Sequence, residues 1–354
     1  MTEFKTPVSK RTRNKLAGNP EFQTPIKIPA SPFLQQIGYG CGVNVFTFQR
    51  SPKVGFTRSP WAIKKRNKNV MKDSKYNARI QLEADILRKL SHPNIVGFRA
   101  LTYSSDGEPC LAMEKLEISL GDLIEEKLEA GEVEFPANII LKIGFEIAKG
   151  LEYLHHTAYV LHGDIKSYNI LTTKDYKTVK ICDFGVSIPL TKALEMDTST
   201  GEFMYIGTQC WSAPEIINEN GPVTNKADIW AFGLVLWEMI ALSPPHIENE
   251  DESMNLDTDD SMLECAVLNQ SKENDDPNSD MEDDFLQNLK DPDTSNYGTR
   301  PPLPAIQLGK EYDKVLELFY ACTDEDYKTR PSAKGVVMFF KNFVKITSDE
   351  TSKV

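Results

Sequence analysis

The chain has 354 residues, 40% of them hydrophobic, which is enough to bury the core of one large domain or of two lobes. It has no run of about 18 apolar residues, and its first residues lack the apolar stretch of a signal peptide. We therefore expect neither membrane insertion nor secretion. The six cysteines form no CxxC pair and no Cys/His cluster with metal-ligand spacing. This pattern predicts reduced thiols in a cytoplasmic or nuclear protein.

The net charge of −12 comes from one segment of the chain. Residues 248–293 hold 17 Asp and Glu residues against Lys272 and Lys290, whereas the rest of the chain is slightly basic. The segment is also poor in aromatic residues, so it can bury little surface. We predict an acidic, largely disordered insertion at about 248–297.

Residues 1–30 are polar and lack hydrophobic periodicity, which predicts a flexible arm. Thr6 and Thr24 each precede a proline, and the residues after Thr24 fit the preference of cyclin-dependent kinases. We expect phosphorylation of at least one of these threonines, with a cyclin-dependent kinase as the upstream partner. The basic run at 10–15 has no interleaved aromatic residues, so direct nucleic-acid binding is not expected.

In chain order, the first part of the sequence predicts a sheet and one helix. Short runs with strand composition are separated by turn residues, and the apolar residues from Ile80 to Leu90 fall on one helical face before His92-Pro93. The predicted strands are 43–48, 61–65 and 110–114, and the predicted helix is about 71–90.

The second part is mostly helical. Apolar residues from Ile140 to Leu154 recur at spacings of three and four, and the run after Asp228 is almost wholly apolar, as in a buried helix. A β-rich part followed by a helical part predicts an α+β enzyme with two lobes, at 31–116 and 117–347. The predicted helices begin at 137, span 226–242 and lie within about 311–345, and short strands are predicted at 169–173 and 178–182.

Three alternating glycines, Gly38, Gly40 and Gly42, stand between strand-like runs. Glycines let backbone amides approach phosphate groups closely, although the same spacing also occurs in ordinary β-turns. Further on, Lys64 lies in an apolar strand and needs an anion. Glu83 in the next helix is the natural partner, and the two would hold the α- and β-phosphates of ATP. Either residue alone is more commonly a surface residue.

The run from His162 to Asn169, HGDIKSYN, is more specific. In phosphoryl transfer, Asp164 would orient or deprotonate the acceptor hydroxyl, Lys166 would steady the γ-phosphate, and Asn169 would bind Mg²⁺. When the run is taken alone, an exposed turn is the alternative interpretation.

Asp183-Phe184-Gly185 follows a strand-like run and would direct a second carboxylate to the metal. Ala213-Pro214-Glu215 comes next, with Arg330 as the candidate cation for Glu215. The order and spacing of these motifs resemble the protein kinase superfamily over residues 33 to about 345. The resemblance implies a two-lobed fold, ATP and Mg²⁺ as cofactors, and other proteins as substrates.

The resemblance also assigns further residues. Leu87, His162 and Phe184 match a packed internal spine, and Asp228 matches the residue that ties the catalytic loop to the buried helix. The metal ligands would be Asn169 and Asp183. The remaining positions of the ATP pocket would be Ile37, Val45, Ala62, Met113, Glu114 and Leu171.

The class of acceptor hydroxyl stays open. Lys166 and Gly207-Thr208 resemble serine/threonine kinases, whereas KICDFGVS at 180–187 is similar to the MAP kinase kinases, which modify Thr and Tyr. Many kinases also carry an arginine where this chain has Gly163, and that arginine pairs with a phosphate on the activation loop. The candidate phosphosites of this loop are Thr198, Ser199 and Thr200.

Short matches outside these motifs resemble the PDZ-binding kinase family, also called T-LAK cell-originated protein kinase, which is MAP-kinase-kinase-like and associated with mitosis. They are FKTP (4–7), IPASPF (28–33), the glycine loop with its third glycine one place early, SPWAIKK (59–65), HGDIKS (162–167) and GTRPP (298–302) after an acidic insertion. The tail at 348–354 ends in Ser352-Lys353-Val354, which fits the carboxyl-terminal pattern that PDZ domains bind. We expect a PDZ-domain partner that contacts Ser352 and Val354.

The alternative is a pseudokinase scaffold, which binds partners through the kinase fold without transferring phosphate. Such scaffolds have typically lost a residue of the transfer machinery, whereas this chain keeps all of them. These residues are Lys64, Glu83, Asp164, Asn169 and Asp183. The sequence therefore favours catalysis.

Overall fold

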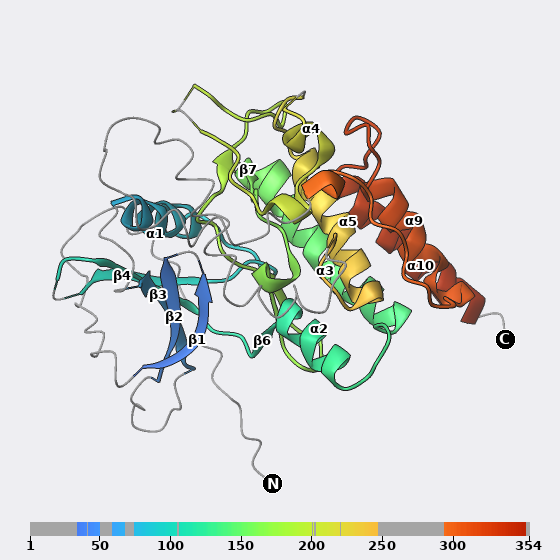
Figure 1. Ribbon diagram of the computed structural model, residues 1–354, viewed down its shortest axis with the longest axis horizontal. Helices are drawn as coiled ribbons and strands as arrows, with labels where there is room; N and C mark the ends of the chain where they lie inside the picture. The colour runs from blue at the N-terminus through green and yellow to red at the C-terminus, as the bar shows by residue number, and fades with distance from the viewer. Residues whose placement is uncertain are drawn as a thin grey trace, which may run out of the picture.

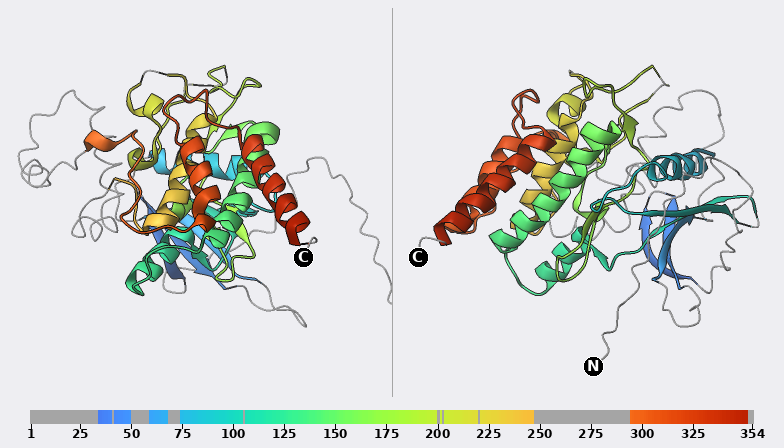
Figure 2. Two further views of the ribbon diagram at one scale, coloured as in Figure 1. Left: turned by 90° about the vertical axis from the view of Figure 1, so that its right-hand side faces the viewer. Right: turned by 180° about the vertical axis from the view of Figure 1, so that it is seen from behind.

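The chain forms a smaller lobe with one helix on a sheet and a larger, helical lobe (Figures 1 and 2). This computed structural model describes residues 34–40, 42–49, 59–67, 74–104, 106–199, 201, 203–219, 221–246 and 294–351. The predicted α+β class is confirmed. The predicted arm at 1–30, most of the acidic insertion and the last three residues lie outside the described residues.

The smaller lobe is a five-stranded antiparallel sheet in the order β1-β2-β3-β5-β4, with one helix packed against it. Its elements are β1 (Gln35–Gly40), β2 (Val43–Phe48), β3 (Trp61–Arg66), α1 (Ser74–Leu87), β4 (Phe98–Tyr103) and β5 (Pro109–Glu114). The three strands and the helix that were predicted here are present, but α1 ends before the predicted residue 90. β1 and β4 were not predicted.

The register of the sheet brings the predicted ATP-pocket residues Ala62 and Met113 opposite each other on neighbouring strands. β3 is a central strand, with Ala62 opposite Met113 and Lys64 opposite Leu111 of β5. β2 and β5 flank β3, and Ile63 and Lys64 are buried on opposite faces of this strand, with α1 packed against the sheet. A charged residue on this strand is therefore held inside the lobe, where it needs a partner of opposite charge.

The larger lobe is built around α3 (Ala137–Tyr153) and α5 (Lys226–Ala241). Every residue of α5 from Ala227 to Ile240 is buried, as its apolar sequence predicts. α2 (Leu120–Glu129) begins at Ser119, whose hydroxyl accepts from the amide of Asp122 in a capping box. The remaining helices are α4 (Pro214–Ile217), α9 (Asp313–Cys322) and α10 (Ala333–Thr351), and Figure 2 shows α9 and α10 on the outer side of the lobe.

Short strands carry the loops that lie between the lobes. They are β6 (Ile118–Ser119), β7 (Val160–Leu161), β8 (Ile170–Thr172), β9 (Val179–Ile181) and β10 (Ile188–Pro189). β8 pairs with β6 and β9, and β7 pairs with β10, all antiparallel. The catalytic-loop motif lies between β7 and β8, and Asp183-Phe184-Gly185 lies between β9 and β10. The pairing therefore brings both motifs to one place.

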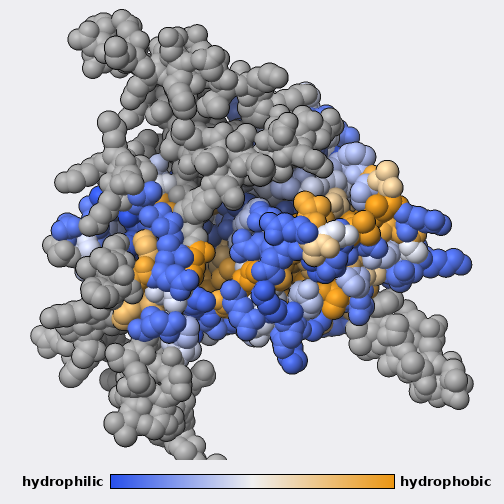
Figure 3. All heavy atoms as spheres, turned by 60° about the horizontal axis from the view of Figure 1, so that its bottom comes forward, coloured by the Kyte–Doolittle hydropathy of each residue, from blue (hydrophilic) through white to orange (hydrophobic). Residues whose placement is uncertain are grey.

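Two boundaries differ from the predictions. α10 continues to Thr351, beyond the predicted helix end at about 345 and into the predicted tail, because no glycine or proline interrupts residues 336–351. Residues 294–296, at the end of the predicted insertion, form a 3₁₀ turn. None of the described helices has the length and apolar character needed to cross a bilayer. The described part of the face in Figure 3 is largely hydrophilic, with smaller apolar patches.

Candidate active site

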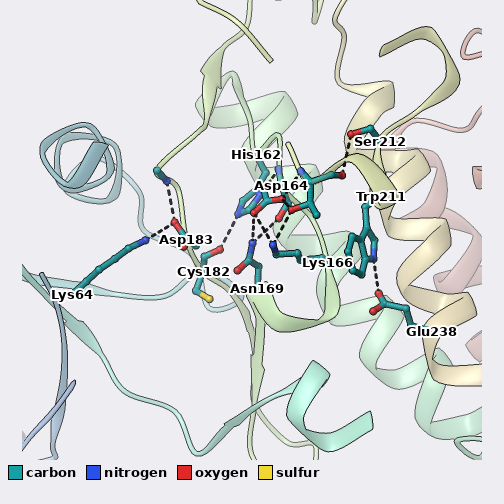
Figure 4. A network of polar contacts seen from close by, with 12 residues as sticks. Lys64, His162, Asp164, Lys166, Asn169, Cys182, Asp183, Trp211, Ser212 and Glu238 are labelled. Carbon is teal, nitrogen blue, oxygen red and sulfur yellow. Dashed lines mark hydrogen bonds and ion pairs between the residues drawn. The ribbon is translucent and has the colours of Figure 1, made fainter. Parts of the chain in front are cut away.

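Lys64 on β3 forms two ion pairs at the junction of the lobes. Its Nζ lies 3.0 Å from Oε2 of Glu83 on α1 and 2.7 Å from Oδ1 of Asp183. The predicted pairing with Glu83 is thus present. Figure 4 shows Lys64 reaching across to Asp183, a contact that was not predicted.

Burial and charge act against each other in this group. Burial raises the pKa of the Glu83 carboxyl, although Lys64 opposes the rise. Burial would also raise the pKa of Asp183, but the attraction and hydrogen bond of Lys64 outweigh it and lower that pKa. Burial would lower the pKa of Lys64, but Asp183 and Glu83 raise it. Lys64 is therefore cationic and Asp183 anionic at neutral pH, as contacts with phosphate and metal require.

Asp183 and Asn169 are the donors that could hold a metal ion. The Asp183 side chain is 41% exposed, and its backbone has a φ of 63°. The amide nitrogen of Asn169 donates to the backbone oxygen and to Oδ2 of Asp164, both at 2.8 Å, which leaves the amide oxygen as an acceptor. No group of three His, Cys, Asp or Glu residues suited to a metal occurs in the described ranges. Two oxygen ligands fit Mg²⁺, which usually completes its shell with phosphate oxygens and water.

Asp164, Lys166 and Thr208 form a compact polar group. Oδ1 of Asp164 accepts from the Thr208 amide at 3.1 Å and from the Thr208 hydroxyl at 2.7 Å. Lys166 Nζ donates to the same hydroxyl oxygen at 2.8 Å and lies 3.7 Å from Oδ2 of Asp164. Thr208 thus holds a carboxylate and an ammonium group beside each other. The sequence singled out Gly207-Thr208 only as a sign of acceptor class.

Side chains of His162 and Asp228 hold the backbone next to Asp164 by hydrogen bonds. Nδ1 of His162 accepts from the amide of Asp164 at 3.2 Å, so its Nε2, 2.9 Å from the carbonyl of Cys182, carries the proton. Asp228 on α5 accepts from the amides of His162 and Gly163, both at 2.9 Å, and contacts Nε2 of His155 at 2.8 Å. The predicted tie between the catalytic loop and the buried helix is therefore present.

The predicted spine is packed as a unit. The rings of His162 and Phe184 meet edge to face with centroids 4.9 Å apart. Leu87 and Phe184 are fully buried in the same hydrophobic core. This packing joins α1 of the smaller lobe to the loops of the larger lobe.

A second buried carboxylate lies under the catalytic loop. Glu238 of α5 accepts from the hydroxyl of Ser167 at 2.5 Å. It also accepts from Nε1 of Trp211 at 2.9 Å (Figure 4). Burial raises the pKa of Glu238 to about 7. Sequence reasoning missed these three residues. The available signal was an acidic residue within the apolar run of α5, which in a buried helix requires donors.

The glycine loop is the hairpin between β1 and β2, with Gly38 opposite Val45 and Gly40 opposite Val43. Gly42 has a φ of +68°, and a Cβ there would lie 2.4 Å from the ring of Tyr76 on α1. Glycine is therefore required at this position by both backbone conformation and space.

The other predicted ATP-pocket residues differ in exposure. Ala62 and Met113 are buried, Val45 and Leu171 are half-buried, and Ile37 is exposed. Apolar side chains around Lys64 are consistent with a pocket for a planar base. The carboxylate of Glu114 is engaged by the Gly97 amide at 3.0 Å and by Lys180 Nζ at 3.1 Å.

Gly163 and Gly207 lie back to back beside Tyr205. Gly163 has a φ of +79°, and a Cβ on Gly207 would lie 2.4 Å from the Gly163 carbonyl oxygen and 2.6 Å from the Tyr205 ring.

Backbone hydrogen bonds hold the activation segment. The amide of Met196 donates to the carbonyl of Val223, and the amide of Asp197 donates to the carbonyl of Pro189. These backbone contacts order the described part of the activation segment, whose Thr198 and Ser199 are exposed. Thr200 lies outside the described residues.

Glu215 and Arg330 form the predicted pair. Two parallel contacts of 2.8 Å join the carboxylate to the guanidinium group, and both side chains are buried. The guanidinium group also lies 4.9 Å from the ring centroid of Trp230. The pair connects α4 to the segment before α10 and lies outside the group that surrounds Asp164.

Comparison with known proteins agrees with this geometry. The protein kinase domain family matches residues 33–339. The chain belongs to this family. It uses ATP and a divalent metal ion, as protein kinase domains do, and it acts on proteins.

Three relatives show how far the similarity extends. The chain is 46% identical to the lymphokine-activated killer T-cell-originated protein kinase of Homo sapiens, over 95% of this chain and 97% of that protein. It is 40% identical to mitogen-activated protein kinase kinase kinase 13-B of Xenopus laevis over 48% of this chain and 16% of that protein. It is 36% identical to cell division control protein 7 of Schizosaccharomyces pombe over 49% and 15%, respectively. The predicted resemblance to the T-LAK cell-originated kinase family is confirmed.

Proposed function

We propose that this kinase transfers the γ-phosphoryl group of Mg-ATP to serine and threonine hydroxyls of protein substrates. The observation that carries the proposal is the contact of the Thr208 hydroxyl with both Asp164 at 2.7 Å and Lys166 at 2.8 Å. It places a proton acceptor and a cation side by side, as transfer to a hydroxyl requires.

The residues of the chain have separate roles in this reaction. Asp164 orients the acceptor hydroxyl and accepts its proton, while Lys166 stabilises the negative charge on the transferred group. Lys64, kept in place by Glu83, binds the α- and β-phosphates. Asp183 and Asn169 would hold Mg²⁺, which neutralises charge on the phosphate oxygens when bound. Since the Lys64–Glu83 pair is already formed, no rearrangement of α1 is required.

Transfer assays with purified wild-type protein and Asp164→Asn test the proposal. Peptides that differ only in carrying Ser, Thr or Tyr as the acceptor distinguish strict serine/threonine specificity from dual specificity. We expect Ser and Thr peptides to be phosphorylated by the wild type and not by the variant. Binding of Mg-ATP without any transfer would support the pseudokinase scaffold instead.

We further propose a cellular setting for this activity, in mitotic or MAP kinase signalling in the cytoplasm or nucleus. The support is the similarity to the T-LAK cell-originated kinase and to a cell division control protein. Phosphorylation of Thr6 or Thr24 in dividing cells, by a cyclin-dependent kinase, is the corresponding expectation. Mass spectra of mitotic protein with both residues unmodified would contradict it.

The carboxyl terminus would bind a PDZ domain through Ser352 and Val354. In that mode the terminal side chain fills a pocket and the carboxylate is held by backbone amides. Deletion of Val354 should abolish capture of PDZ proteins while kinase activity is unchanged. Equal capture after the deletion would show that the tail has another role.

A further inference from the structure

Glu238 is a buried carboxylate whose described side-chain donors are neutral, with the ammonium group of Lys166 as a nearby charge. It is 1% exposed on α5, and no ion pair to it occurs in the part of the chain that the structure describes. Its side-chain donors are the Ser167 hydroxyl at 2.5 Å and Trp211 Nε1 at 2.9 Å, and the Ser167 backbone adds a further hydrogen bond. Because burying an unsatisfied carboxylate is costly, both donors are held firmly against it.

The two donors come from segments that carry the reacting groups. Ser167 directly follows Lys166 in the catalytic loop, and it is itself 1% exposed. Trp211 closes the 3₁₀ turn after Thr208, with its amide donating to the Thr208 carbonyl at 3.0 Å. One carboxylate therefore sets the distance between these two segments.

Lys166 lies where both segments meet. Its Nζ donates to Thr208 at 2.8 Å and stands 5.9 Å from the ring centroid of Trp211, at the outer range of a cation–π contact. Figure 4 shows Lys166 beside the Trp211 ring, with Glu238 below the indole. A shift of either segment would move the ammonium group relative to Asp164.

We propose that Ser167 and Glu238 are positioning residues for phosphoryl transfer, which hold Lys166 and Thr208 in register with Asp164. They do not touch substrate, and they act through the catalytic loop and through Trp211. The inference rests on the proposed transfer activity. It predicts that loss of the Ser167 hydroxyl slows the transfer step and leaves substrate binding unchanged, because misplacing a reacting group by a fraction of an ångström is costly in rate.

Steady-state kinetics of Ser167→Ala test this role. We expect kcat to fall about tenfold, which is about 1.4 kcal/mol of transition-state stabilisation, with KM for ATP and for peptide within about twofold of the wild type. Thr323→Val is the matched control, because Thr323 has an equally buried hydroxyl near α9, on the outer side of the lobe. This control should lose stability without losing kcat.

Two conservative variants should restore most of the rate. Ser167→Thr keeps the hydroxyl, and Glu238→Gln can accept from Trp211 while donating to Ser167, so each should stay within about threefold of wild-type kcat. Each kcat is measured well below the melting temperature of that variant, so loss of folded protein does not enter. Because threonine adds a methyl group at a buried position, Glu238→Gln decides the outcome if Ser167→Thr is unstable.

The kinetic results distinguish failure of the positioning role from failure of the proposed transfer activity. An inactive wild type would overturn the proposed activity itself. An active wild type with Ser167→Ala within twofold in kcat would overturn the positioning role. A loss in KM instead of kcat, or an equal loss of kcat in Thr323→Val, would overturn it as well.

Discussion

On the smaller-lobe side of the site, Lys64 divides its charge between two carboxylates, one of them on the 41% exposed side chain of Asp183. On the larger-lobe side, Glu215 and Arg330 form a closed, bidentate pair with both side chains buried. The first arrangement can exchange a partner for phosphate or metal, whereas the second has no group left to exchange. Ion pairs of similar length are therefore suited to binding in one region and to stability in the other.

The two regions differ in whether every donor of the cation already has a hydrogen-bond partner. Every donor nitrogen of Arg330 has a partner, because Nε also donates to the carbonyl of Asp324 at 2.7 Å. Breaking such a pair leaves a buried charge alone, which costs far more than the pair contributes when intact. Lys64 already faces two anions, so a nucleotide would replace one interaction with another.

The largest effect is expected from the exchangeable side. Asp183→Asn should lower kcat by about a thousandfold or more, since a charge that acts on the metal is lost, and Lys64→Met should be similarly impaired. Both variants should remain folded, although Lys64→Met also leaves the buried carboxylate of Glu83 with one cation fewer. Asp175→Asn is the control, because Asp175 is an exposed acid paired with Lys177. Near-normal turnover of Asp183→Asn, in a preparation free of other kinases, would remove the assigned role.

The closed pair should give the largest change in stability. Arg330→Leu should lower the free energy of unfolding by about 3–5 kcal/mol, as measured by urea titration. Arg330→Lys should recover little, because an ammonium group cannot make two parallel contacts. Lys314→Met breaks an exposed pair with Glu317 and should cost less than about 1 kcal/mol. Equal losses of unfolding free energy in Arg330→Leu and Lys314→Met would show that the buried pair has no special role in stability.

Glu238 gives a smaller, pH-dependent effect. Its pKa rises from 4.5 to about 7 on folding, mainly through burial, so the native protein binds a proton that the unfolded chain releases in this range. Stability from this group is therefore lost as pH rises from about 5 to about 7. The unfolding free energy of Glu238→Gln relative to wild type should increase by about 1–3 kcal/mol between pH 5 and 7.5. Parallel pH curves would show that Glu238 has an ordinary pKa.

The smallest effect is expected in the activation segment. Alanine at Thr198, Ser199 and Thr200 should lower activity by less than about tenfold, because Gly163 offers no cation to a phosphate. Loss of two or three charge-assisted contacts would instead cost about 100-fold. Such a loss, with folding and ATP binding intact, would mean that another cation binds the phosphate. Lys192, Arg79 and Arg88 would then be replaced in turn.

The sequence predicted contacts of charged residues that were expected to be buried, because a buried charge requires a partner of opposite charge. A lysine in an apolar strand and an acid on the next helix led to the Lys64–Glu83 pair, and a glutamate before a buried helix led to Arg330. Glu238, an acidic residue within the apolar run of α5, also needs donors, but nothing in the sequence identifies Ser167 and Trp211 as those donors, since serine and tryptophan are common at many sites. Their contact joins residues 71 and 27 positions apart, and only the packing of α5 under the loops brings them together.

The same limit applies to the fold. Strong alternation and helical spacing located β2, β3, β5, α3 and α5 to within a few residues, because each buries one side of a regular pattern. Residues 35–37 of β1 are exposed and β4 is mostly half-buried, so both strands lack that contrast. α2 is short, and its local signals were the capping pair Ser119 and Asp122 and three apolar residues at helical spacing, Leu120, Leu123 and Ile124.

Gly163 restricts how this lineage could change. An arginine there would have to adopt a φ of +79° and place its Cβ 3.3 Å from the carbonyl oxygen of Val186. Tyr205 lies 4.0 Å from that Cβ position, which is an ordinary contact, so the backbone conformation and the Val186 carbonyl are what oppose the substitution. A descendant that acquired an arginine here by one codon change would therefore begin with a strained backbone in its catalytic loop, which is a barrier to gaining a phosphate receptor at this position.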